Sequence, residues 1–354
     1  MVTPRFFNSA MIRIFLFLGI ILCGCTSPPY LYKGEQYKGI SFVAPLKAVN
    51  DSAFHKICAV NASCISLMPY SFCKPKEARL YHGGNTKWQW WGESKDGILE
   101  CIKMAHKAKL KAILKPHSWM EDGAFTGDFK LQKEEEWQTF EKDFEDYILD
   151  FAKIADSTHI EIFCIGTELH SFVEARPQFW QQLIEKVRLS YKGKITYAEN
   201  WDKYPKFPFW NKLDFIGVDA YFPLTEEANP SINSLKEGWK KHIAELEQIS
   251  AQHQKPILFT EFGYCSTEFT TQKPWEEIHT HSYNEDAQNT AYLAIFESVW
   301  TQKWFAGGFA WKWFPNPDYH HSERDLYSPQ NKKAENTLKM SYLKNWNKIV
   351  SSAN

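Results

Sequence analysis

Eight short apolar runs recur along the chain, and amphipathic stretches separate most of them. Each run is rich in β-branched or aromatic residues and is apolar at consecutive positions, which is typical of parallel strands that are covered on both faces. We therefore predict eight strands, at Gly39–Val43, Cys64–Tyr70, Lys111–Trp119, Ile160–His170, Lys194–Trp201, Leu213–Tyr221, Pro256–Tyr264 and Gly307–Phe314.

The stretches between these runs carry the period of amphipathic helices. Between residues 134 and 155, aromatic and aliphatic side chains recur at three- and four-residue spacing with charged residues between them. The same pattern predicts helices at Asp96–Lys109, Pro177–Ser190, Ser234–Gln252 and Glu285–Thr301, whereas the link from Trp201 to Leu213 is too short and proline-rich for a full helix. Repeated strand–helix units of this kind predict an α/β fold, a single (β/α)₈ TIM barrel over residues 38–350.

The first 24 residues have the pattern of a secretory signal. Arg5 and Arg13 precede the apolar stretch Ile14–Leu22, which is too short to span a membrane. The stretch ends in a Leu-Cys-Gly-Cys sequence that resembles a bacterial lipoprotein box, so Cys25 would become the lipidated N-terminus, followed by a linker to residue 37. No acidic residue directly follows Cys25, which favours the outer membrane of the cell envelope. An ordinary secretory signal with a chance cysteine is the alternative.

Charge and cysteine content narrow the class of protein. A net charge of −1 excludes the basic face that nucleic-acid binding requires. Six further cysteines show no Cys-x-x-Cys spacing and no histidine cluster, so we predict neither a metal site nor a cofactor. Two of them, Cys164 and Cys265, lie in predicted strands and read as packed thiols. Export would permit disulfides among the other four, in a pairing that the sequence leaves open: Cys58, Cys64, Cys73 and Cys101.

Polar and aromatic residues gather where the predicted strands end. In a TIM barrel the chemistry lies at the carboxyl ends of the strands, and a purely structural barrel does not need such a concentration. The residues are Lys115, His117 and Trp119 after the third strand, Glu168 and His170 after the fourth, Glu199, Asn200 and Trp201 after the fifth, Asp219 and Tyr221 after the sixth, Glu261 and Tyr264 after the seventh, and Trp311, Lys312 and Trp313 after the eighth. We therefore predict an active site at this rim.

Two of these residues, Glu168 and Glu261, end apolar runs on strands that lie across the barrel from each other. Two facing carboxyl groups are what glycoside hydrolysis needs, one protonated to assist the leaving oxygen and one ionised to attack the anomeric carbon. For either glutamate alone, an ion pair that caps the strand is the structural alternative.

The motifs KPHSW, IGTELH, WDKYPKFPFWNKLDFIGVDAYFPL and FTEFGY together resemble glycoside hydrolase family 113, whose known members are mainly β-1,4-mannanases. The resemblance implies a retaining (β/α)₈ enzyme in which Glu168 is the acid/base and Glu261 the nucleophile. The larger clan usually has asparagine just before the acid/base, where it contacts the sugar 2-hydroxyl. This chain has Thr167, so that contact must be made differently.

The other rim residues receive substrate-binding roles from their chemistry. Lys115 and His117, beside Trp119, can donate to sugar hydroxyls. Tyr221 can hold the nucleophile, and Tyr264 joins the same rim.

Further rim residues carry open alternatives. Asp219 contacts hydroxyls or forms a salt bridge within the rim. Asn200 and Trp201 suit a sugar subsite. Either Trp311 or Trp313 forms the platform under the reacting sugar, and we favour Trp311 because alternation sends only one inward.

The loops beyond the rim add further candidates. Trp90, between Trp88 and Trp91, forms a loop wall of the binding site or packs against the next helix. His320 and His321 suit a cleft edge better than a metal site.

The sequence thus predicts a lipid-anchored monomer that cleaves an oligo- or polysaccharide, as a retaining endo-β-1,4-mannanase with two glutamates and no cofactor. Another β-glycan as substrate, or a non-catalytic glycan-binding protein, are the alternatives.

Overall fold

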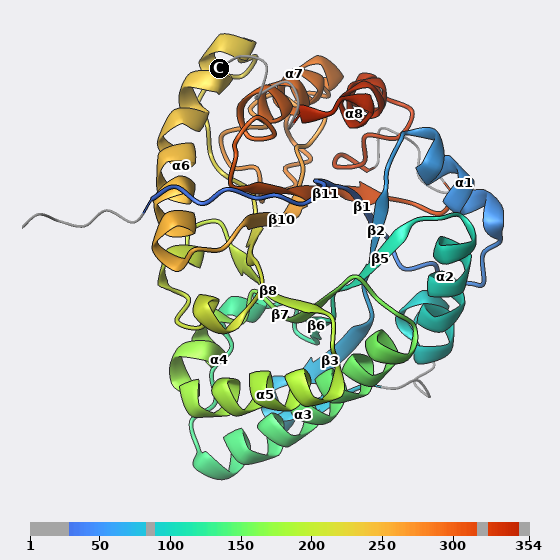
Figure 1. Ribbon diagram of the computed structural model, residues 1–354, viewed down its shortest axis with the longest axis vertical. Coiled ribbons are helices and arrows are strands. Elements are labelled where there is room, and N and C mark those ends of the chain that lie inside the picture. Colours follow the sequence, from blue (N-terminus) through green and yellow to red (C-terminus); the bar gives the residue numbers. More distant parts are fainter. Residues whose placement is uncertain (1–27, 83–88, 317–324, 347–354) are drawn as a thin grey trace, which may run out of the picture.

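The computed structural model describes residues 28–82, 89–316 and 325–346. Eight parallel strands close into a barrel in the order β1-β11-β10-β9-β8-β7-β5-β2 (Figure 1). They are β1 (Tyr37–Phe42), β2 (Cys64–Leu67), β5 (Lys111–Leu114), β7 (Ile162–Thr167), β8 (Lys194–Asn200), β9 (Ile216–Asp219), β10 (Ile257–Phe262) and β11 (Phe305–Trp313). Each corresponds to one of the predicted strands, and the predicted (β/α)₈ fold is confirmed.

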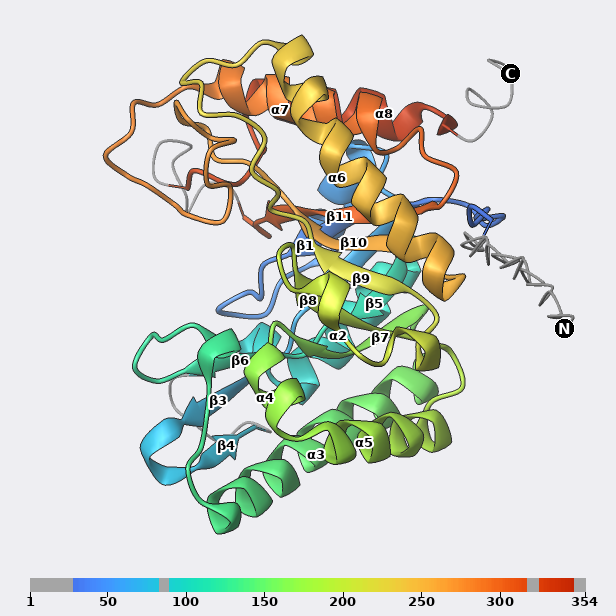
Figure 2. The same ribbon diagram turned by 90° about the vertical axis from the view of Figure 1, so that its left-hand side faces the viewer.

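Helices surround the barrel (Figures 1 and 2). The five predicted ones are α2 (Lys95–Lys107), α3 (Glu134–Ser157), α5 (Pro177–Ser190), α6 (Ile232–His253) and α7 (Glu285–Ser298). Three shorter ones were not predicted, α1 (Asp51–Ala59), α4 (His170–Ala175) and α8 (Lys333–Leu343). The link after β8 contains only two single-turn 3₁₀ helices, Tyr204–Lys206 and Trp210–Lys212, as its prolines indicated.

A second, three-stranded sheet stands beyond the barrel's strand ends, in the order β4-β3-β6 (Figure 2). Its strands are β3 (Tyr70–Lys74), β4 (Arg79–Tyr81) and β6 (His117–Met120). Two of the predicted strands, Cys64–Tyr70 and Lys111–Trp119, extended from the barrel into this sheet. In the structure each is broken by a proline, the first at Pro69 and the second at Pro116. Proline has no N–H for the strand ladder, so the chain leaves the barrel there and pairs in the separate sheet.

The core of the described residues has a small cluster inside the barrel, a large one between strands and helices, and a third around Tyr221. The inner cluster includes Cys64, Ile113, Ile162 and Leu258.

All six cysteines in the described part of the chain are free thiols, so no disulfide forms among the four candidates. In that same part, no helix is long and apolar enough to cross a membrane.

Candidate active site

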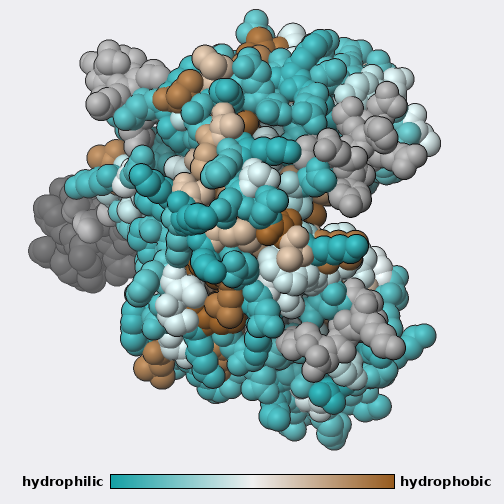
Figure 3. Space-filling view, turned by 90° about the vertical axis from the view of Figure 1, so that its right-hand side faces the viewer, coloured by the Kyte–Doolittle hydropathy of each residue, from teal (hydrophilic) through white to brown (hydrophobic). Residues whose placement is uncertain are grey.

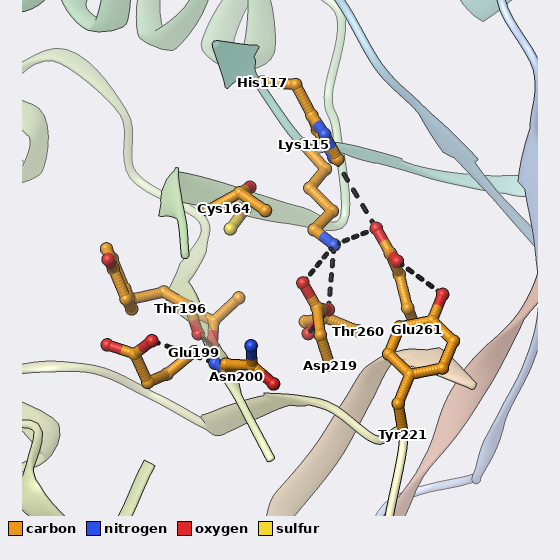
Figure 4. A network of polar contacts seen from close by, with 12 residues as sticks. Lys115, His117, Cys164, Thr196, Glu199, Asn200, Asp219, Tyr221, Thr260 and Glu261 are labelled. Atoms are coloured by element: carbon orange, nitrogen blue, oxygen red, sulfur yellow. Dashed lines mark hydrogen bonds and ion pairs between the residues drawn. The ribbon is translucent and has the colours of Figure 1, made fainter. Parts of the chain in front are cut away.

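Glu261, near the end of β10, is only 6% exposed and is held by two donors (Figure 4). The ammonium of Lys115 lies 2.5 Å from its Oε1. The hydroxyl of Tyr221 donates to its Oε2 at 2.8 Å. A buried carboxylate needs such partners because an unpaired charge is costly to remove from water. Tyr221 thus makes the hydrogen bond to Glu261 that the sequence suggested.

Asp219, at the end of β9, shares the same lysine. Lys115 Nζ lies 2.9 Å and 3.0 Å from the two Asp219 oxygens, and the Thr260 hydroxyl donates to Oδ1 at 2.7 Å. Lys115 is 0% exposed. Burial acts to lower the pKa of Lys115, but the two carboxylates raise it above its usual value. Lys115 is therefore a buried counter-ion and not a sugar ligand, which corrects our prediction, and Asp219 forms the salt bridge that was its alternative.

Glu168 directly follows β7 and is fixed through its backbone. Its φ of 51° is left-handed, which is uncommon for a residue with a side chain. Its N–H donates to the Ala198 carbonyl at 2.8 Å, and the N–H of Leu169 donates to the Tyr197 hydroxyl at 2.7 Å. Among the residues that the structure describes, none donates a hydrogen bond to the Glu168 carboxyl group.

Burial raises the pKa of both glutamates. Burial, together with the charges of Asp219 and Glu261, raises the pKa of Glu168 well above its usual value. Burial and Asp219 also raise the pKa of Glu261, to about 7, against the lowering effect of Lys115 and Tyr221. The charge of Glu261 therefore favours the protonated form of Glu168. Lys115 and Tyr221 favour the ionised form of Glu261, whereas the Glu168 carboxyl group has no such donor among the described residues.

Aromatic rings stand next to the nucleophile candidate. His117 Nε2 lies 3.7 Å from Glu261 Oε1, too far for a direct hydrogen bond. The His117 ring is stacked against Trp311, with centroids 6.4 Å apart and planes 14° apart. Burial and the nearby Lys115 lower the pKa of His117 well below its usual value, so the ring is neutral. Trp311 is partly exposed beside this ring, where a platform for a sugar would lie.

The end of β8 contributes a polar turn and a tryptophan pair. The N–H of Asn200 donates to Glu199 at 2.9 Å, and Asn200 Oδ1 accepts from the N–H of Trp201 at 2.8 Å. Trp201 stacks on Trp275 with centroids 5.2 Å apart. Trp275 was missed, because it lies in the loop after β10 and nothing in its sequence context marks it as a neighbour of Trp201.

Other candidates lie outside this cluster. Trp313 is 3% exposed and packs in the large core cluster, and Tyr264 is fully buried against Tyr292. Both predictions of a substrate-binding role are thereby corrected, because neither ring is open to a ligand. Trp119 is 56% exposed on β6, and Trp90 is 43% exposed before the short 3₁₀ helix Trp91–Glu93.

Two sets of predictions fall on residues that are not described. Trp88, His320 and His321 lie outside the described residues, as does Cys25. Within residues 28–82, 89–316 and 325–346, no group of three or more His, Cys, Asp or Glu side chains is arranged to hold a metal ion.

A (β/α)₈ barrel with two unlike carboxyl groups at its catalytic rim is the framework of a glycoside hydrolase. Comparison with known protein families also gives a glycoside hydrolase, and it identifies one family within that class. The family model of glycoside hydrolase family 113 matches residues 84–333, which is well over half of the chain. The chain belongs to glycoside hydrolase family 113, and it is an enzyme that acts on a carbohydrate substrate. No curated protein sequence matches it significantly.

Solved structures share its fold. A family 113 β-mannanase from Alicyclobacillus acidocaldarius, solved with ManMIm, has a TM-score of 0.77 at 24% identity, over 88% of this chain and 98% of that one. A second family 113 β-1,4-mannanase has a TM-score of 0.74 at 21% identity, over 88% and 99%. A β-glucuronidase from Faecalibacterium prausnitzii has a TM-score of 0.59 at 11% identity, over 90% of this chain and 49% of that one.

Proposed function

We propose that this glycoside hydrolase is an endo-β-1,4-mannanase that works by a retaining double displacement. The proposed mechanism rests on one observation, which is that the carboxyl groups of Glu261 and Glu168 have different surroundings. Glu261 has two donors that favour its charge, and Glu168 has a pKa that favours its proton. The choice of mannan is supported by membership of family 113 and by the two β-mannanases that share the fold.

In the proposed first step, Glu261 attacks the anomeric carbon while Glu168 gives its proton to the departing glycosidic oxygen. One C–O bond forms to Glu261 as the bond to the leaving sugar breaks. In the second step, Glu168 takes a proton from water, which attacks the anomeric carbon and releases Glu261 as a carboxylate. Two inversions at one carbon give net retention.

The surrounding residues support these two reaction steps in different ways. Lys115 and Tyr221 hold Glu261 in one orientation and lower its pKa against the effect of burial. The neutral His117 can donate to a sugar hydroxyl, and Trp311 beside it offers a flat apolar surface to the reacting sugar. Asn200 and Trp201 stand on the next strand from Glu168, where a neighbouring sugar would bind.

A substrate panel with product analysis tests the proposal. We expect β-mannan to be cleaved to oligosaccharides of mixed length from the first minutes, with the β-anomer formed first as seen by NMR. A first-formed α-anomer contradicts the retaining mechanism. Activity confined to another β-glycan supports that alternative substrate, and no reducing sugar from any glycan supports a binding protein. The Glu261→Ala variant is the control for contaminating activity.

We also propose that the enzyme is a monomer anchored to the outer membrane through a lipid on Cys25. Support comes from the Leu-Cys-Gly-Cys sequence after the apolar stretch, and from a candidate site built from one chain. The wild type should partition with membranes and into detergent, and Cys25→Ser should be soluble. A soluble wild type in cells that process lipoproteins contradicts the anchor.

A further inference from the structure

The three-stranded sheet beyond the barrel carries aromatic side chains on one face. Along β3, Tyr70 and Phe72 are partly exposed, while the alternating residues Ser71 and Cys73 are buried. Residues that pair directly across strands share a face. Phe72 pairs with Tyr81 on one side and with Trp119 on the other, so these three side chains form a row across the sheet.

A second row connects this face to the catalytic rim. Tyr70 pairs with His117, and their ring centroids are 5.2 Å apart. His117 in turn lies 3.7 Å from Glu261. Trp119 is two residues further along β6, which is roughly 6.5 Å and comparable to the length of one sugar unit. The aromatic face, defined as Tyr70, Phe72, Tyr81, His117 and Trp119, therefore starts at the nucleophile candidate and leads outward.

The shape of the molecule leaves this region accessible. Trp119 is the most exposed tryptophan in the described part of the chain. Figure 3 shows the outline hollowed on its right-hand side, between the upper and lower halves of the molecule. Figure 2 views the molecule from the opposite side, and there the sheet stands at the lower left. An exposed apolar surface that continues a catalytic rim is a typical ligand-binding surface.

The charges at the outer edge indicate what kind of ligand fits. At the outer end of the row, Lys74 and Arg79 lie over the Tyr81 ring, 5.3 and 5.6 Å from its centroid, and they are paired with Glu77 at 3.4 Å and Asp143 at 2.5 Å. These cations are compensated, so the face has no excess of either charge, and Trp119 is its most exposed ring. Such a surface suits the apolar C–H faces of a neutral sugar better than an anionic one.

We propose that the aromatic face is an outer subsite that binds the substrate glycan beyond the sugars at the catalytic centre, with Trp119 as its main platform. The inference rests on the proposed function, since it assumes a neutral β-linked polysaccharide. It makes the enzyme dependent on chain length. A long substrate gains contacts on the second sheet that a short one never reaches.

The test is Trp119→Ala in the full-length enzyme. For long manno-oligosaccharides we expect KM to rise roughly tenfold, equivalent to about 1.4 kcal/mol, with unchanged kcat/KM on a short aryl mannoside. Trp119→Phe should recover part of the loss. Leu189→Ala, which truncates an exposed side chain on α5 that is 76% exposed, is the matched control.

A second readout needs no turnover. In the Glu261→Ala background, calorimetry with mannohexaose should show a similar weakening of the dissociation constant when Trp119→Ala is added. Unchanged KM and unchanged binding in an active enzyme overturn the subsite. A wild type that ignores mannan contradicts the proposed function instead, and the same comparison is then made on the glycan that it does cleave.

Discussion

The ends of β10 and β7 each present a glutamate to the same rim, yet they hold it in different ways. Glu261 is fixed by its side chain, through the ammonium of Lys115 and the hydroxyl of Tyr221. Glu168 is fixed by its backbone, through a left-handed φ and main-chain hydrogen bonds around it. Its carboxyl group has no donor in the described part of the chain.

The difference matches two chemical tasks. A nucleophile must be charged and aimed at one carbon, so donors to the carboxylate help it. An acid/base must hold a proton, release it and take another, so donors to its charged form would work against it. The comparison teaches that the environment of each strand end, more than the identity of the residue, separates the two proposed roles.

The largest expected effect comes from removing either glutamate. Glu261→Ala and Glu168→Ala should each lower activity on mannan by a factor on the order of 10⁴. With an activated aryl mannoside and azide, Glu168→Ala should give the β-glycosyl azide, because Glu261 still forms the covalent intermediate. Glu261→Ala should give the α-glycosyl azide by direct attack.

The anomers are distinguished by NMR. The same azide anomer from both variants would show that the roles are misassigned. Full activity in either variant would remove the basis of the comparison between the two strand ends.

Removing the buried cation should have the next largest effect. Lys115→Met leaves Asp219 and Glu261 buried without their counter-ion, which should cost roughly 3–5 kcal/mol of unfolding free energy and abolish most activity. Chemical denaturation measures the first effect. Lys236→Met is the matched control, because its pair with Glu297 joins α6 to α7 at the surface and should be worth less than about 1 kcal/mol. Equal losses in the two variants would mean that Lys115 is not a special counter-ion.

The hydrogen bond from Tyr221 should set part of the pH dependence. The proposed mechanism requires an ionised Glu261, so wild-type kcat/KM should rise with pH through about 7 and fall as Glu168 loses its proton. Tyr221 lowers the pKa of Glu261, so Tyr221→Phe should move the rising limb to higher pH and lower kcat/KM roughly 10- to 100-fold.

Tyr292→Phe is the control for this change, because it removes a buried hydroxyl that has no hydrogen-bond partner in the described structure. A rising limb that stays in place in Tyr221→Phe would assign that limb to another group.

The smallest expected effect comes from weakening the main-chain hydrogen bonds around Glu168. Tyr197→Phe removes the acceptor for the Leu169 N–H, which should cost about 1 kcal/mol of stability and lower kcat on mannan less than tenfold. An aryl mannoside with a good leaving group should be less affected, because it needs little protonation by Glu168. Tyr191→Phe removes a comparable 2.7 Å hydrogen bond near the opposite end of β7 and should leave kcat unchanged. Equal kcat losses in both would contradict a local role for Tyr197.

The barrel strands and five of the helices could be predicted because buried parallel strands and amphipathic helices leave patterns within a few residues. The second sheet was missed. Pro69 and Pro116 mark the two breaks, but no local pattern shows that the segments after them pair with each other in a separate sheet. The role of Lys115 was misread for a related reason. Its partners Asp219 and Glu261 are 104 and 146 residues away, and only the closed barrel shows that all three side chains meet inside it.

The lysine shared by two carboxylates has a consequence for the charge of the pocket through the proposed cycle. At the start, Lys115 is positive, Asp219 and Glu261 are negative and Glu168 is neutral, which leaves one excess negative charge. In the covalent intermediate Glu261 is a neutral ester and Glu168 is ionised, so the excess is the same but has crossed the pocket. Lys115 then still has Asp219, at 2.9 Å, to balance it. The total charge stays constant while the reaction moves it from one strand end to the other, so the two steps require no net exchange of charge with solvent.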